Sequence, residues 1–165
     1  MKKLFALVLL FAPLSMMAQK FGHINSQEIL NSMPEYATAR TEVETLQKQF
    51  EQDLQGMQAE LQKKAEAFEK EEKDLPEKIK ERRVKELQDL DARIKQSYQD
   101  NSQTLQETSA KKMQEITAKI TEAIKAVGME GGYVYIMDVT GGVPYISTTL
   151  STDVTAQVKE KLKIK

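Results

Sequence analysis

Cysteine and tryptophan are absent from the 165-residue chain, and histidine occurs only once. The absence of cysteine excludes a disulfide framework, a thiol nucleophile and an iron–sulfur cluster, and one histidine does not complete a usual zinc site. The formal net charge of −1 provides no overall positive field for nucleic-acid binding. Aromatic residues make up 6% of the chain and charged residues 30%. This composition is typical of a long helical or coiled-coil protein and argues against a compact enzyme.

The N-terminus has the pattern of a secretory signal peptide. Lys2 and Lys3 precede an apolar run over residues 4–14, and small residues follow up to Ala18. We expect cleavage after Ala18, which removes residues 1–18 and leaves 22 basic and 25 acidic residues, a formal net charge of −3. An uncleaved anchor is the alternative, but the apolar run is shorter than the roughly 20 residues that a membrane span needs.

A short strand and a helical turn are expected to open the mature chain. Phe21, His23 and Asn25 alternate with Gly22 and Ile24, which suits a short strand. Asn25 and Ser26 are suited to cap the helical turn that follows, and Pro34 interrupts that turn.

Two long segments with helical periodicity follow, over residues 34–75 and 77–127, and Pro76 separates them. Apolar residues recur in both at steps of three and four, which predicts one apolar stripe on each helix. The first stripe consists of Val43, Leu46, Phe50, Leu54, Met57, Leu61, Ala65 and Phe68. The second consists of Leu87, Leu90, Ile94 and Tyr98, and then of Met113, Ile116, Ile120, Ile124 and Val127.

The two stripes match each other if the chain folds back near Pro76. Facing residues of an antiparallel hairpin have numbers that add to a constant. Leu61 with Leu90 gives 151, and the other matched pairs give 151 or 152. We therefore predict a long antiparallel helical hairpin, or arm, over residues 34–127. Polar Asn101 and Ser109 fall on the same axis, which predicts a seam that is tight near the tip and looser midway.

The C-terminal segment is expected to form a β-hairpin and a short helix. Gly128, Gly131 and Gly132 should end the second long helix. Strands are predicted over residues 133–139 and 143–147, and Thr152 or Asp153 should cap the last helix. The fold is thus mainly α with a small β body, made of residues 19–33 and 128–165.

The predicted sheet carries too many apolar residues for a small sheet in water. Because isolated small sheets are marginally stable, we expect an oligomer in which these sheets close together. The alternative is a monomer in which the chain's own helices cover the sheet. The candidate oligomerisation residues are Phe21, Ile24, Tyr133, Tyr135, Ile136, Val143, Tyr145 and Ile146.

Two features of the arm are candidates for binding other proteins or lipids. The first is the basic tip cluster, which consists of Lys78, Lys80, Arg82, Arg83 and Lys85. These side chains suit acidic protein segments or lipid head groups, but they also suit a solvated helix face with acidic neighbours. The second is a set of apolar and aromatic residues, namely Phe50, Met57, Phe68, Tyr98 and Met113. Such residues suit weak contacts with changing partners, and the alternative is that they only form the hairpin seam.

No reactive constellation or cofactor motif is visible in the chain. His23 lacks a second histidine or a cysteine as co-ligand, so we expect it to have a structural role. No Ser/His/Asp arrangement, phosphate-binding glycine loop or carboxylate pair stands out. The expectation is a non-enzymatic protein without a catalytic residue, metal or cofactor.

The two ends of the chain resemble the OmpH/Skp family of periplasmic outer-membrane-protein chaperones. The resemblance rests on residues 21–30 (FGHINSQEIL) and on three C-terminal stretches, 135–138 (YIMD), 143–145 (VPY) and 153–158 (DVTAQV). It implies a homotrimer with a barrel-like body, from which three helical hairpins surround a cavity. It also implies that unfolded outer-membrane proteins are held there without ATP, and that basic clusters bind lipopolysaccharide. Family members often have strongly basic arms, whereas this mature chain is formally acidic.

The leading hypothesis is therefore an ATP-independent periplasmic holdase for unfolded outer-membrane proteins. The rival is a structural or adaptor coiled coil of the cell envelope, which would bind one folded partner in a saturable, stoichiometric complex.

Overall fold

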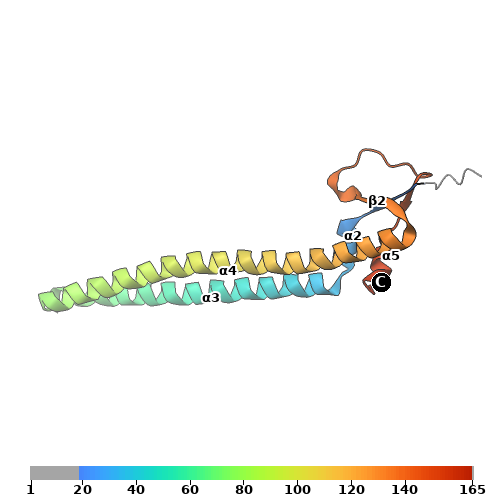
Figure 1. The fold of residues 1–165 in the computed structure, drawn as a ribbon. Helices are drawn as coiled ribbons and strands as arrows, with labels where there is room; N and C mark the ends of the chain where they lie inside the picture. Colours follow the sequence, from blue (N-terminus) through green and yellow to red (C-terminus); the bar gives the residue numbers. More distant parts are fainter. Residues whose placement is uncertain (1–18, 165) are drawn as a thin grey trace, which may run out of the picture.

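The computed structural model describes residues 19–164, so the expected signal peptide lies outside the described residues. The described chain is mainly helical, with a small sheet at one end of a long two-helix arm (Figure 1). The elements are β1 (Lys20–Ile24), α2 (Ser26–Ser32), α3 (Pro34–Glu71), η1 (Glu72–Asp74), α4 (Glu77–Gly131), β2 (Tyr133–Asp138), η2 (Val139–Gly141), β3 (Ser151–Asp153) and α5 (Thr155–Lys161). The predicted fold class is confirmed.

The arm is an antiparallel hairpin of α3 and α4, as predicted. The two helices lie side by side from the turn at the tip to the base, and Pro76 directly precedes α4 (Figure 1). Ion pairs between the helices, Glu42 with Lys112 and Glu35 with Lys119, define the register near the base. The residue numbers of both pairs add to 154, so the register there differs by two or three residues from the predicted 151–152.

The hairpin seam is unevenly packed along its length. Side chains of α4 are buried in two groups, Leu90 and Ile94 in the outer part and Ile116, Ile120, Ala123 and Val127 near the base. The predicted stripe of α3 is only half-buried along its whole length. Along the arm α3 packs mainly against α4, which covers just part of each of its apolar side chains.

The prediction that Tyr98 belongs to the seam is wrong. Its side chain is 65% exposed, and the neighbouring Ser97 is half-buried instead. Asn101 is half-buried as predicted, whereas Ser109 is exposed and Thr108 takes the inner position. The inner row of α4 therefore continues from Ile94 by a step of three to Ser97, and not by the predicted step of four to Tyr98.

The sheet is parallel throughout, so the predicted C-terminal β-hairpin is wrong. The strand order is β2-β1-β3, and β1 pairs in parallel with both neighbours. Residues 143–147 form no strand, and the third strand is β3, which was expected only to provide a helix cap. Residues 139–150 therefore connect one edge of the sheet to the other, and Val143, Tyr145 and Ile146 lie in this connection. Pro144 has no amide hydrogen for a strand ladder, which agrees with its position outside the sheet.

Of the three glycines that were expected to end the second long helix, only Gly132 ends α4. Gly132 has a positive φ of 66° and its amide donates to the carbonyls of Gly128 and Met129. This is the left-handed conformation in which helices commonly end on glycine. Gly128 and Gly131 lie within the helix, so α4 extends beyond residue 127.

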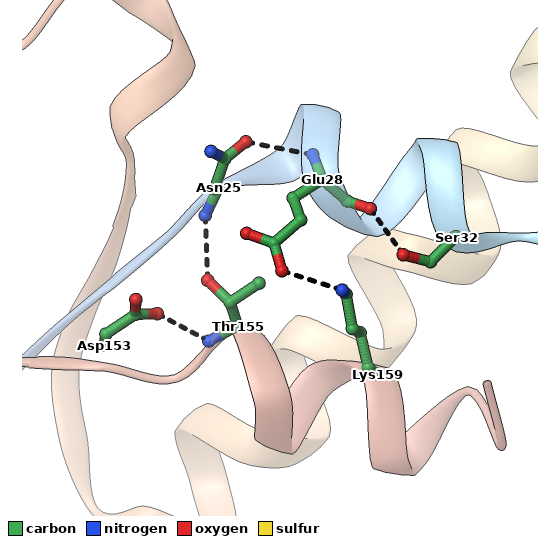
Figure 2. A network of polar contacts seen from close by, with 6 residues as sticks. All are labelled: Asn25, Glu28, Ser32, Asp153, Thr155 and Lys159. Atoms are coloured by element: carbon green, nitrogen blue, oxygen red, sulfur yellow. Dashed lines mark hydrogen bonds and ion pairs between the residues drawn. The ribbon is translucent and has the colours of Figure 1, made fainter. Parts of the chain in front are cut away.

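The hydrophobic core lies in the base, where both ends of the chain meet α4. It contains Ile24, Ile29, Met33, Ile116, Ile120, Ala123, Val127, Val154 and Val158. Polar contacts join the same elements at the surface (Figure 2). The amide of Asn25 donates to Thr155 Oγ1 over 3.0 Å, and Lys159 Nζ donates to Glu28 Oε1 over 2.8 Å. The first strand, α2 and α5 are thus held together by apolar packing and by hydrogen bonds across more than a hundred residues of sequence.

Candidate binding surfaces and assembly interface

The basic tip cluster lies on the first turns of α4, next to the turn of the hairpin. Lys80 pairs with Glu77 over 3.8 Å and Arg83 with Glu86 over 3.7 Å, both within the same helix. Within residues 19–164, three exposed members of the cluster form no ion pair within 4.0 Å, namely Lys78, Arg82 and Lys85. These three charges are available to an anionic partner, whereas the other two are partly offset by their neighbours.

The apolar candidates of the arm occupy two different environments. Phe50, Met57 and Phe68 are half-buried at the seam on α3, so each has a covered and an exposed side. Met113 lines a groove of about 370 Å³ between α3 and α4 near the base, together with Tyr36. The exposed flanks of the seam therefore form an apolar rim along the arm, and Tyr98 lies outside the seam.

The outward face of the sheet exposes apolar and aromatic side chains. Phe21 lies opposite Tyr135 in the β1–β2 register, and their ring centroids are 4.9 Å apart. Tyr135 is 50% exposed and Met137 43% exposed. Because Gly22 and Ile24 alternate with Phe21 and are buried, Phe21 and Tyr135 lie on the face turned away from the core.

The predicted oligomerisation residues are divided between this outward face and the core. Ile24 is only 2% exposed, and Tyr133 and Ile136 pack partly against the same core, so these three contribute mainly to the chain's own base. Tyr145 in the connection is 80% exposed, and Val143 and Ile146 are half-buried. Other exposed apolar residues escaped the sequence-based reasoning, namely Val134, Met137 and Leu150. Side chains two residues apart in a strand lie on the same face, so an outward Tyr135 indicates that Met137 also faces outward.

The only histidine lies on the same outward face as Phe21. His23 Nδ1 is 2.9 Å from the hydroxyl of Ser151, and His23 lies opposite Asp153 in the β1–β3 register. No group of three side chains that could hold a metal ion occurs within residues 19–164. No helix in this range is both long enough and apolar enough to span a membrane.

The carboxylate of Asp138 ties the end of β2 to the start of α2. It accepts hydrogen bonds from the hydroxyl of Ser26 over 2.5 Å, from the amide of Ser26 and from the amide and hydroxyl of Thr140. Burial on its own raises the pKa of Asp138, but these hydrogen bonds together outweigh it and lower the pKa below its ordinary value. Burial also raises the pKa of Asp153. Hydrogen bonds from Thr155 and the charge of His23 outweigh this effect, so the pKa of Asp153 is lowered below its ordinary value.

Low pH will destabilise the folded end of the molecule that contains the sheet, because Asp138 and Asp153 become protonated. A carboxyl group whose pKa is lowered by folding contributes stability above its unfolded pKa of about 3.9, and this contribution is lost as the pH falls through the folded value. The free energy of unfolding should therefore fall between pH 5 and pH 3, as measured by urea titration followed by circular dichroism. Asp138→Asn should be less stable at pH 7 and should depend less on pH over this range. Identical pH profiles for the two proteins would contradict the assignment.

Comparisons with known proteins give one consistent result. Residues 20–162 match the family model described as outer membrane protein (OmpH-like). The chain is 27% identical to the chaperone protein Skp of Yersinia enterocolitica over 158 residues, which is 93% of this chain and 92% of that protein. The fold is similar to a crystal structure of an OmpH-like protein from Caulobacter crescentus CB15, with a TM-score of 0.76 and 16% identity, covering 87% of this chain and 83% of that one.

Proposed function

The chain belongs to the OmpH-like family, and on this premise we propose that it is an ATP-independent periplasmic holdase for unfolded outer-membrane proteins. The proposal is supported above all by the arm, whose apolar stripe stays half-exposed over the whole of α3. With 38 residues, α3 alone spans about 57 Å at 1.5 Å per residue. Half-exposed apolar side chains over this length suit many weak contacts with an extended chain.

Client binding is proposed to occur along the seam flanks and at the tip. Phe50, Met57, Phe68 and Met113 would offer flexible apolar contacts, and the exchange of such contacts is fast because each one is weak. Lys78, Arg82 and Lys85 would add contacts with acidic client segments or with the phosphates of lipopolysaccharide. Such contacts should weaken as the salt concentration rises, because exposed charges are screened.

Assembly into a homotrimer is proposed to bring three arms around one cavity. The outward sheet face, with Phe21, Tyr135 and Met137, is the surface that would be covered in this assembly. Covering it would remove exposed apolar area and protect the sheet edges, which otherwise invite pairing with other chains. Residues 1–18 would direct export to the periplasm as a signal peptide that is then cleaved off.

The purified mature chain, in molar excess, should prevent the aggregation of a denatured β-barrel outer-membrane protein diluted into buffer. We expect light scattering at 360 nm to fall at least fivefold in the absence of ATP, because many weak contacts keep the client dissolved. Charge reversal of Lys78, Arg82 and Lys85 to glutamate should reduce this protection at low salt but not at high salt.

Two results would decide against the holdase. Unchanged scattering in molar excess would exclude it directly. A saturable, stoichiometric complex with one folded partner, without suppression of aggregation for unrelated clients, would instead support an adaptor coiled coil of the cell envelope. Bovine serum albumin at the same mass concentration serves as the control for nonspecific protection.

A further inference from the structure

The only histidine of the chain lies in the middle of the outward sheet face. His23 belongs to β1, the central strand, and lies opposite Met137 of β2 and Asp153 of β3 in the two strand registers. Phe21 and Tyr135, whose ring centroids are 4.9 Å apart, lie two residues earlier along β1 and β2. Side chains two residues apart in a strand share one face, so the imidazole has these rings as neighbours. The surface through which assembly is proposed thus has a histidine at its centre.

The hydrogen bond between His23 and Ser151 suits both charge states of the imidazole. His23 Nδ1 is 2.9 Å from Ser151 Oγ. A hydroxyl donates to the bare nitrogen of a neutral imidazole and accepts from the N–H of a protonated one, so a proton on Nδ1 costs no partner. The protonated ring carries a second N–H at Nε2, and no group within residues 19–164 accepts a hydrogen bond from it. Only solvent can provide this partner in a separate chain.

Asp153 partly compensates a positive charge on His23. The two residues pair in register, and the charge of His23 favours the ionised form of the Asp153 carboxylate. That carboxylate also accepts a hydrogen bond from the amide of Thr155 over 2.9 Å (Figure 2). Both residues belong to the same chain, so their attraction is present whether the chain is separate or assembled. To first order it therefore contributes equally to the two forms.

The other elements next to His23 bring no further charge to the outward face within residues 19–164. On β1, Lys20 directs its ammonium to the carbonyl of Gly131 over 3.1 Å. On β2, the titratable neighbour is Tyr135, a phenol, and phenols are ordinarily uncharged below about pH 9. Residues 139–150, which connect β2 to β3, include no charged residue and only Tyr145 as a titratable one. His23 and its counter-charge on β3 therefore determine the charge of this face.

Covering the outward face changes the balance between the two charge states of His23. A positive charge that loses its water is strongly disfavoured unless another partner replaces the water, and Nε2 has no such partner in its own chain. The side chains that would enclose it include Phe21, Tyr135 and Met137, which are apolar or aromatic. In a symmetric trimer, three imidazolium groups would also repel one another. Both effects arise only on assembly, and both favour the neutral ring.

We propose that His23 is a pH switch of assembly, in which the neutral histidine permits the outward sheet faces to close together and the protonated histidine separates them. The proposal rests on the homotrimer of the proposed function. The assembled form holds fewer protons than the separate chains, so a fall in pH shifts the equilibrium toward separate chains. The transition falls between pH 8 and pH 6, because histidine ordinarily changes charge in this range. Separate chains no longer enclose a client, so acidification would release it.

The composition of the chain isolates this pH range. The chain has one histidine and no cysteine, so His23 is the only side chain that ordinarily titrates between pH 6 and pH 8. The amino group at the N-terminus of the mature chain titrates near the same range. Asp138 and Asp153 have lowered pKa values and change charge only at more acidic pH. A change in assembly between pH 8 and pH 6 therefore has two candidate groups, and variants of His23 distinguish them.

The molar mass of the full mature chain, measured without client over a dilution series, tests the proposal. Light scattering coupled to size-exclusion chromatography, at pH 8 and pH 6 with EDTA and one ionic strength, gives the concentration at which half of the trimers have separated. We expect this half-dissociation concentration to be about tenfold higher at pH 6, because three histidines per trimer lose their protons on assembly. At concentrations that keep the trimer at both pH values, far-ultraviolet circular dichroism should show equal helical content, which excludes unfolding as the cause.

Three variants assign the effect to the position of the imidazole. His23→Gln has an amide that stays neutral and can still bond to Ser151, so its half-dissociation concentration should change less than twofold between the two pH values. Tyr98→His, added to His23→Gln, restores a histidine at a position of the arm that is 65% exposed, and it should not restore the pH dependence. His23→Lys carries a charge at both pH values and should be separated at pH 8, at concentrations where the parent chain is assembled.

Each failure of the pH switch differs from a failure of the proposed assembly. Equal half-dissociation concentrations of the parent chain at pH 8 and pH 6 would overturn the switch and leave the homotrimer intact. The switch is also wrong if His23→Gln keeps the full pH dependence, if Tyr98→His restores it, or if His23→Lys assembles at pH 8 as the parent does. A molar mass of one chain at every concentration and both pH values would exclude the homotrimer and the switch with it. No client takes part, so these results do not depend on holdase activity.

Discussion

Replacing Ile29 with alanine will lower the free energy of unfolding by about 2–4 kcal/mol, the usual range for removing a large aliphatic side chain from a core. Ile29 is 0% exposed and lies on α2, where it belongs to the same core cluster as Val154 and Val158 from the other end of the chain. Its removal leaves a cavity at the point where the two ends of the chain meet α4. Because the base has few buried residues, such a loss is a large fraction of its stability.

Urea unfolding followed by circular dichroism, at one fixed protein concentration, measures this effect. The concentration must be held constant because any assembly stabilises the folded chain by mass action. Leu150→Ala is the control, since Leu150 is 73% exposed, and it should change the free energy of unfolding by less than about 0.5 kcal/mol. A loss of less than about 1 kcal/mol in Ile29→Ala would show that the core is organised differently.

Tyr135→Asp is expected to convert the proposed homotrimer into monomers. Tyr135 is half-exposed on the outward sheet face and contacts Phe21, so an assembly through this face buries it. An unpaired carboxylate costs several kcal/mol when it is buried, and a closed trimer would bury three copies. Light scattering coupled to size-exclusion chromatography should therefore show the molar mass falling from three chains to one.

The matched control places the same substitution on the arm. Tyr98→Asp changes a tyrosine that is 65% exposed and far from the sheet, so it should leave the molar mass unchanged. Far-ultraviolet circular dichroism of both variants should show the helical content of the parent chain, because neither side chain is in the core. A trimer that survives Tyr135→Asp would exclude the outward sheet face as the assembly interface.

The helical hairpin was predictable because its signals are local. Apolar residues recur at steps of three and four, and Pro76 marks the turn between the two helical segments. Each of these signals is contained in a few turns of sequence. The detailed register was less predictable, and Tyr98 shows why. Ser97 and Tyr98 lie three and four residues after the buried Ile94, and both steps are compatible with the inner face of a helix.

The topology of the sheet was not predictable from local pattern. A glycine pair between two strand-like segments favours a β-hairpin, and so residues 143–147 were assigned to a strand. In the structure β1 lies between β2 and β3 and pairs with both, and residues 143–147 belong to the connection outside the sheet. Pairings across more than a hundred residues have no signature in any short window of sequence.

The order of the elements, the long hairpin and the strand-like character of both chain ends follow from residue types and spacing within each segment. Contacts between distant segments decide which strands pair and which side chains of the sheet face outward. They also decide whether Ser97 or Tyr98 enters the seam. Helix formation requires only near neighbours, since its hydrogen bonds span four residues, whereas parallel strands and helix registers are decided by packing over the whole chain.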